Sequence, residues 1–138
     1  MMTSFNHSFV HGRLIRLLGN IDKYEIFPEL SIEINGVEHK PDISIYSKKK
    51  RIQQKDIIKM VELPLVTIEI LSPTQPIQDL IDKFEIYFNA GIKSCWLVIP
   101  HAKSIVIYSS LDHYKTYSDD KVIDNLFNIE LSIIDIFE

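Results

Sequence analysis

The chain has 138 residues, a formal net charge of −4 at pH 7 and 46% hydrophobic residues. These values are typical of a single globular domain that spans residues 1–138, and they exclude a disordered or fibrous chain. No apolar run reaches the roughly 18 residues that a membrane helix needs, and residues 1–20 lack the apolar core of a signal peptide. The single cysteine, Cys95, excludes a disulfide within the chain and suits a reducing compartment. We therefore expect a cytoplasmic protein.

Two segments have the residue spacing of amphipathic helices. Apolar residues recur at helical intervals over residues 4–18. The second helix is expected to begin at Thr74 as its N-cap, to carry Pro76 in its first turn and to end at Gly91. A weaker helical pattern covers residues 56–62.

A β-hairpin is expected between these helices. Apolar and polar residues alternate over residues 30–34 and again over residues 37–45, as in strands with one buried face. The dipeptide Asn35-Gly36 separates the two runs, and it favours a two-residue turn because both central residues must adopt positive φ.

This hairpin predicts which residues face each other. If Ile34 pairs with Val37, then Glu29 lies opposite Asp42 on the polar face of the two strands. Two like charges opposed on a sheet are mildly destabilising, so this pair calls for a cation. A bulge near Pro41 would shift the pairing.

The remaining strands are expected on either side of the second helix. Residues 65–71 form an almost continuous apolar run, typical of a central strand that is covered on both faces. Residues 94–99 and 103–108 are two further strands joined by a turn, and residues 129–137 form an apolar tail that should dock on the domain.

Two acidic residues stand inside segments that otherwise have the pattern of buried strands. Asp42 follows Pro41 within residues 37–45, and Glu69 is the only charge of residues 65–71. Burying a carboxylate costs stability unless a cation or another partner compensates it, so the pattern points to a metal site. The plainer interpretation of Asp42 is a residue that caps a turn at a strand end.

Four further residues, on the two helices, could belong to such a site. Asp79 and Lys83 lie one helical turn apart, so they can pair with each other. They could equally be an exposed helix pair worth about 0.3 kcal/mol. His7 and His11 have a spacing compatible with a metal, but no third ligand is marked nearby, so we do not expect zinc.

The basic residues are concentrated before the central strand. Residues 40–59 contain seven basic residues and two acidic ones. The basic residues are Lys40, Lys48, Lys49, Lys50, Arg51, Lys55 and Lys59. The run from Lys48 to Arg51 could contact the phosphates of a nucleic acid. It could also be an ordinary solvated loop.

Several of these motifs together resemble a known family. The motifs are Pro41-Asp42, Ile68-Glu69-Ile70-Leu71-Ser72-Pro73, Asp79 with Lys83, Tyr87-Phe88-Asn89-Ala90-Gly91-Ile92 and Trp96-Leu97-Val98. They resemble the Uma family of candidate restriction endonuclease domains, which is part of the PD-(D/E)xK nuclease superfamily. The resemblance implies an α/β, restriction-endonuclease-like core with a mixed sheet, helices on its faces and the order helix, strand, strand, strand, helix, strand.

The resemblance also implies a catalytic site. In this superfamily Asp42 and Glu69 would ligate Mg²⁺ or Mn²⁺, with the carbonyl of Ile70 as a further oxygen ligand. The chain departs from the usual pattern because Leu71 stands where the superfamily has its lysine, two residues after the acid. In the Uma family the lysine comes from the following helix, which makes Lys83 the candidate for orienting water or stabilising the transition state.

We therefore expect a metal-dependent phosphodiesterase that hydrolyses DNA. Asp42, Glu69 and Lys83 would be its catalytic residues, Glu29 a further metal ligand and Asp79 a supporting residue. The chain could also assemble as a homodimer. The alternative is a nuclease-like module that has lost efficient cleavage and acts in binding nucleic acid or protein, which Leu71 and the negative net charge would favour.

Overall fold

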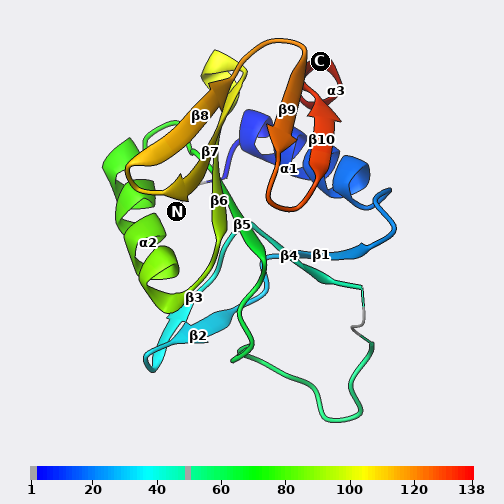
Figure 1. Cartoon of the computed structure of the whole chain (residues 1–138), viewed down its shortest axis with the longest axis vertical. Coiled ribbons are helices and arrows are strands. Elements are labelled where there is room, and N and C mark those ends of the chain that lie inside the picture. Colours follow the sequence, from blue (N-terminus) through cyan, green and yellow to red (C-terminus); the bar gives the residue numbers. More distant parts are fainter. Residues whose placement is uncertain (1–2, 49–50) are drawn as a thin grey trace.

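The computed structural model describes residues 3–48 and 51–138 (Figure 1). The helices are α1 (Phe5–Leu18), α2 (Ile77–Ala90) and α3 (Ile133–Phe137), with a 3₁₀ turn, η1 (Pro100–Ala102). The strands are β1 (Tyr24–Pro28), β2 (Ile32–Ile34), β3 (Val37–His39), β4 (Ile43–Ser47), β5 (Val66–Ile70), β6 (Ser94–Ile99), β7 (Ser104–Ser110), β8 (His113–Tyr117), β9 (Lys121–Asp124) and β10 (Ile129–Ser132). Among the residues that the structure describes, no helix is long and apolar enough to cross a membrane.

A six-stranded sheet organises the molecule, with the strand order β1-β4-β5-β6-β7-β8. Its neighbours pair antiparallel except β5 and β6, which are parallel and are joined by α2. Two small sheets, β2-β3 and β10-β9, lie beside it. This is the mixed α/β architecture predicted from the sequence, and its order α1, β1, β4, β5, α2, β6 is the expected one.

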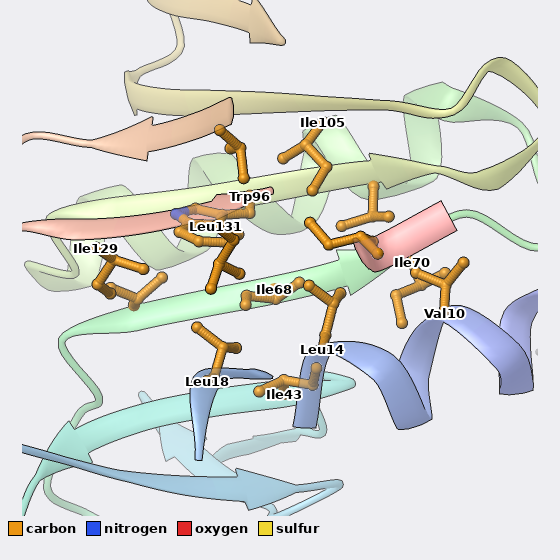
Figure 2. Close-up of a cluster of buried hydrophobic side chains, with 14 of the residues drawn as sticks. Val10, Leu14, Leu18, Ile43, Ile68, Ile70, Trp96, Ile105, Ile129 and Leu131 are labelled. Atoms are coloured by element: carbon orange, nitrogen blue, oxygen red, sulfur yellow. The ribbon is translucent and has the colours of Figure 1, made fainter. Parts of the chain in front are cut away.

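The two faces of this sheet bury separate hydrophobic cores. One core joins α1, α3 and the β9–β10 pair to the sheet. The other joins α2 and the β2–β3 hairpin to the opposite face. Figure 1 shows α2 on one side of the sheet and α1 with α3 on the other. In Figure 2, Leu14 and Leu18 of α1 pack toward Ile68 and Trp96.

Strand β5 contributes to both cores, because successive side chains of a strand point to opposite faces. All of its residues are buried, as predicted for a central strand. Val66, Ile68 and Ile70 belong to the core on the α1 side. Thr67 and Glu69 point the other way, toward the core that contains α2.

The predicted helices and the hairpin are present. Ser4 caps α1 by accepting a hydrogen bond from the backbone N–H of His7 at 3.2 Å. Gly91 ends α2 with φ of 110°, which a residue with a Cβ rarely adopts. Asn35 and Gly36 form the hairpin turn with φ of 51° and 77°.

Two details of the expected elements are wrong. Pro76, and not Thr74, is the residue before the first turn of α2, and it provides no side-chain hydrogen bond to the cap. Residues 56–62 form no helix; Met60 instead makes an isolated parallel bridge to Ile32.

The run over residues 37–45 is split into β3 and β4, with Pro41 in the gap. Proline has no N–H to donate to a ladder, which explains the break. Strand β4 continues the predicted register but pairs with β1, which the sequence did not reveal. The tail contributes β10 and α3, which pack into the core beside α1.

Candidate active site

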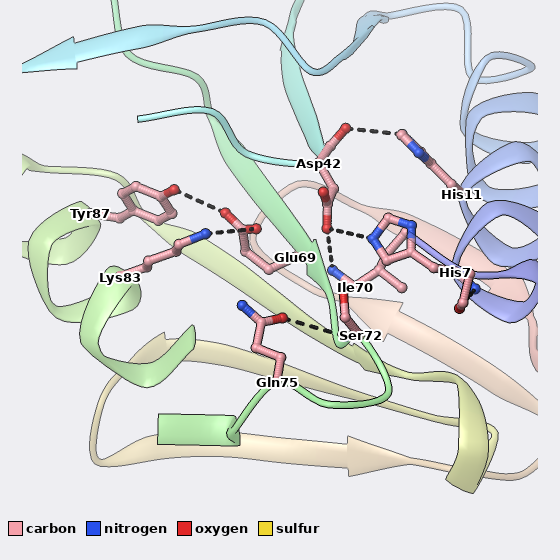
Figure 3. A network of polar contacts seen from close by, with 10 residues as sticks. His7, His11, Asp42, Glu69, Ile70, Ser72, Gln75, Lys83 and Tyr87 are labelled. Atoms are coloured by element: carbon pink, nitrogen blue, oxygen red, sulfur yellow. Dashed lines mark hydrogen bonds and ion pairs between the residues drawn. The ribbon is translucent and has the colours of Figure 1, made fainter. Parts of the chain in front are cut away.

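Asp42 lies immediately before the first residue of β4, which is flanked by β1 and β5 in the main sheet. Its neighbour Ile43 pairs with Ile68, so the next position of the ladder places Asp42 beside Glu69. The Asp42 side chain is buried, and its Oδ2 accepts a hydrogen bond from the backbone N–H of Ile70 at 2.7 Å. This contact fixes the first predicted carboxylate against the end of β5 (Figure 3).

Glu69 is fully buried and faces α2. Its Oε2 accepts a hydrogen bond from the hydroxyl of Tyr87 at 2.9 Å. Its Oε1 has no hydrogen-bond partner, and the nearest cation is the Nζ of Lys83 at 3.8 Å. One oxygen of this carboxylate is therefore held by a neutral donor, while the other is left for a cation.

Burial governs the protonation of Glu69. Loss of solvation raises the pKa of its carboxyl to about 8, and the negative charge of Asp42 acts in the same direction. Lys83 and the hydrogen bond from Tyr87 oppose the rise. The same burial, together with Glu69, raises the pKa of the Tyr87 hydroxyl, so that this group remains a donor.

Helix α2 supplies the cationic side of the site. Lys83 and Tyr87 are four residues apart, so they lie on one face of the helix and both reach Glu69. The Lys83 side chain is one-third exposed. It lines an open groove of about 840 Å³ at the start of α2, together with Ser72, Gln75 and Asp79 among others. The groove gives a ligand access to the ammonium beside the buried carboxylate.

Helix α1 reaches the site from the opposite side. The Nε2 of His7 lies 3.4 Å from the Oδ2 of Asp42, and His7 is buried. The Nε2 of His11 is 3.0 Å from the backbone carbonyl oxygen of the same aspartate. The two histidines that the sequence marked by their spacing therefore both contact Asp42 (Figure 3).

The other predicted site residues lie farther from these contacts. Glu29 sits opposite Asp42 in the expected register, with its backbone N–H bonded to the Asp42 carbonyl at 3.0 Å, but its side chain is exposed. Asp79 lines the groove, and the described residues show no ion pair between it and Lys83, which turns to Glu69 instead. The roles proposed for Glu29 and Asp79 stay predictions.

The basic run is only partly visible. Lys48 and Arg51 are exposed, whereas Lys49 and Lys50 lie outside the described residues. Figure 1 shows the described parts of the connection between β4 and β5 projecting away from the sheet. Its role in nucleic-acid binding stays a prediction.

Three residues that contact Asp42 or Glu69 were not assigned to this site from the sequence: His7, His11 and Tyr87. The spacing of His7 from His11 was compatible with a shared metal, but no third ligand was marked nearby. Asp42 was not considered as a partner of these histidines. Tyr87 follows Lys83 by one helical turn, and that spacing would have placed it on the same face. Its aromatic ring looked like an ordinary part of the core, which it also is.

The residues present fit a hard divalent cation with a partly open coordination shell. Glu69 Oε1 is a buried oxygen without a hydrogen bond, and Asp42 lies at the neighbouring ladder position. Over residues 3–48 and 51–138, no group of three or more His, Cys, Asp or Glu side chains is arranged to hold a metal. Mg²⁺ is commonly bound by one or two carboxylates, with waters and substrate phosphates completing the shell, so two acids suffice.

Comparisons with known proteins identify the family and the fold of the chain. A family described as "Putative restriction endonuclease", Uma2, matches residues 1–133. No curated protein matches the chain.

Two solved structures are similar in shape. The crystal structure of "a putative nuclease belonging to DUF820" from Anabaena variabilis has a TM-score of 0.82 and 23% identity, and the match covers 99% of this chain and 83% of that one. It shows a shared fold. The cryo-EM structure of a DrdV–DNA complex has a TM-score of 0.47 and 9% identity over 94% of this chain and 10% of that one, which is too distant to carry an argument.

Proposed function

The chain belongs to the Uma2 family of restriction-endonuclease-like proteins, and on that premise we propose that it is a metal-dependent phosphodiesterase that cleaves DNA. The family and the fold support a nuclease. The proposal adds three specific properties: the activity depends on Mg²⁺ or Mn²⁺, the substrate is DNA, and the cleavage is endonucleolytic.

One observation carries the proposal: the convergence of Asp42, Glu69 and Lys83 from separate elements. Asp42 and Glu69 are at neighbouring positions of the β4–β5 ladder, and Lys83 of α2 lies 3.8 Å from Glu69. Burial and the charge of Asp42 raise the pKa of Glu69, so the two acids ionise together only at a cost, which a further cation beside them would offset.

Asp42 and Glu69 would hold the divalent cation through their carboxylate oxygens. When bound, the cation would supply Lewis-acid activation of a phosphodiester oxygen and acidification of a water molecule.

The remaining chemistry belongs to the chain's own residues. Tyr87 holds Oε2 of Glu69, so that Oε1 keeps its direction toward Lys83. The Lys83 ammonium, at the groove, would hold a phosphate oxygen or orient the attacking water and stabilise negative charge that develops in the transition state.

The groove and the basic run support a polyanionic ligand. The groove exposes Lys83 at its wall, and the exposed side chains of Lys48 and Arg51, early in the connection between β4 and β5, could contact a phosphate backbone. A cytoplasmic location and a homodimer belong to the same proposal.

The deciding experiment is incubation of the purified chain with supercoiled plasmid and with single-stranded DNA in Mg²⁺, Mn²⁺ or EDTA. We expect cleavage with either metal and none in EDTA. Asp42→Ala and Glu69→Ala should each abolish cleavage while their circular dichroism spectra match that of wild type. Equal nicking by wild type and both variants would reject the site, because a contaminating nuclease would then account for the activity.

The same experiment distinguishes the alternative function. The leucine at Leu71, in the place of the superfamily's lysine, favours a nuclease-like module that binds without cutting. Metal-dependent DNA binding without any cleavage, measured on the same substrates, would support this alternative.

A further inference from the structure

His7 occupies an unusual position for a polar side chain. It is 3% exposed, on the face of α1 that also buries Val10, Leu14 and Leu18. Neither of its ring nitrogens meets the geometry of a hydrogen bond. A buried polar group without a hydrogen bond costs stability, and an apolar residue at this position would avoid that cost. The position therefore calls for an explanation other than packing.

Among the described residues, the ion-pair partner of the His7 ring is Asp42. The Nε2 of His7 lies 3.4 Å from its Oδ2, slightly beyond hydrogen-bond distance. That same oxygen already accepts the Ile70 N–H at 2.7 Å. Both contacts to the carboxylate therefore converge on Oδ2, while His11 holds the backbone carbonyl of Asp42 at 3.0 Å. Helix α1 thus contacts Asp42 at both its main chain and its side chain.

We propose that His7 is a positioning residue for the metal ligand Asp42. In the metal-bound protein its Nε2–H would donate to Oδ2 and restrain the Asp42 carboxylate, which together with Glu69 would hold the cation. This inference rests on the proposed function, because it assigns His7 a role only in a protein that binds a divalent cation. Partners that hold ligating groups in this way typically contribute 10–100-fold to metal affinity.

The placement of His7 is built into the start of α1. Ser4 caps the helix by accepting the N–H of His7, which fixes the backbone at this point. Because the Ser4 hydroxyl oxygen accepts from the backbone N–H of His7 and does not contact its ring, Ser4→Ala loosens the same helix end without removing the imidazole. It therefore serves as the matched control for a general effect of α1.

The experiment is a Mn²⁺ titration of the full chain, followed by electron paramagnetic resonance of free and bound Mn²⁺. The variants are His7→Phe, which keeps a ring without a donor, His7→Gln, which keeps an N–H near the position of Nε2, and Ser4→Ala. We expect His7→Phe to weaken Mn²⁺ binding about 10–100-fold. His7→Gln should recover most of this loss, and Ser4→Ala should bind as wild type does.

Three results would overturn the positioning role alone. They are equal Mn²⁺ affinity in His7→Phe and wild type, an equal loss in Ser4→Ala and His7→Phe, and ¹⁴N coupling to bound Mn²⁺, which would make His7 a direct ligand. If wild type binds no Mn²⁺ at all, the proposed function fails together with this inference.

A measurement on wild type covers the case in which His7→Phe does not fold. In protein labelled with ¹⁵N-histidine, the imidazole shifts report which ring nitrogen carries the proton. We expect His7 to be protonated at Nε2, the nitrogen that faces Asp42. A tautomer with the proton on Nδ1 and a bare Nε2 would contradict the proposal.

Discussion

Two fully enclosed acids of this protein, Asp124 and Glu69, have very different surroundings. Asp124 at the end of β9 accepts three hydrogen bonds: Oδ2 from Ser94 Oγ at 2.6 Å and from Trp96 Nε1 at 2.8 Å, and Oδ1 from the Leu126 N–H at 3.1 Å. Glu69 accepts one, from Tyr87, and its other oxygen has none.

The difference separates a structural acid from a functional one. Both oxygens of Asp124 accept from neutral donors: Oδ2 ties β9 to Ser94 and Trp96 of β6, and Oδ1 holds the turn after β9 through Leu126, so neither oxygen is bare. Glu69 keeps a bare oxygen 3.8 Å from an ammonium that lines a groove. Burial alone does not mark a catalytic carboxylate; burial with unused hydrogen-bonding capacity does.

The cation beside Glu69 offers the largest test of this contrast. If Lys83 acts on the transition state, Lys83→Met should lower kcat about 10²–10³-fold and change Mn²⁺ and DNA affinity far less. Steady-state cleavage and binding assays measure both quantities. Lys121→Met is the matched control, since it removes a lysine whose ion pair with Glu130 lies away from the groove. Unchanged turnover in Lys83→Met would show that Lys83 is an ordinary surface residue of α2 with no part in catalysis.

Metal-dependent stabilisation should distinguish the two acids directly. A hundredfold excess of Mn²⁺ over Kd should stabilise wild type by about 2.7 kcal/mol. Glu69→Gln should lose most of this stabilisation and Asp124→Asn should keep it, although each deletes one buried charge with little change of shape. Melting curves in EDTA and across a Mn²⁺ titration give the comparison. Equal metal-dependent shifts in both variants would remove Glu69 from the ligand set.

Asp124→Asn should instead reduce the stability of the protein without metal. The amide cannot accept all three hydrogen bonds, so at least one buried donor loses its partner, at a cost of about 1–3 kcal/mol. Urea unfolding in EDTA measures this loss. Asp119→Asn, on the exposed turn before β9, should change stability little. If the two variants were equally stable, the hydrogen bonds of Asp124 would not be needed for the fold.

The sequence predicted elements whose signals are local. Helices α1 and α2, the hairpin turn and the buried strand β5 follow from periodicity and from Asn35-Gly36, all read within a few residues. Strand β1 was missed because Tyr24–Pro28 is short, half-buried along its length and ends in proline, so it has no clear alternation. Its identity as a strand depends on pairing with β4, a tertiary contact.

The same difference between local signals and tertiary contacts applies to the candidate site. Asp42 and Glu69 were marked because carboxylates in apolar segments conflict with local expectation, and Lys83 came from the family resemblance. Tyr87 conflicts with nothing locally, since an aromatic residue is expected on the apolar face of α2, whereas His7 is a polar residue on the apolar face of α1 whose partner is distant in the sequence. Only the packing of α1 and α2 on opposite sides of the sheet edge brings them to the two carboxylates.

The last prediction concerns pH, and it tests the same contrast without any substrate. In the folded protein without metal, burial raises the pKa of Glu69 to about 8 from its ordinary value of about 4.5. Between these values the unfolded chain has released this proton while the folded chain still binds it, so the free energy of unfolding falls as pH rises. The contribution is fully present below about pH 4.5 and is lost as pH passes through about 8. Glu69→Gln cannot titrate, so its stability relative to wild type should increase across this window, by at most about 1.4 kcal/mol per pH unit, and then level off. Urea unfolding of both proteins in EDTA from pH 4.5 to 9 measures the difference, in which the titration of all other groups largely cancels. A difference that does not change with pH would show that the folded protein binds no extra proton at Glu69, and the bare oxygen that distinguishes it from Asp124 would then be solvated after all.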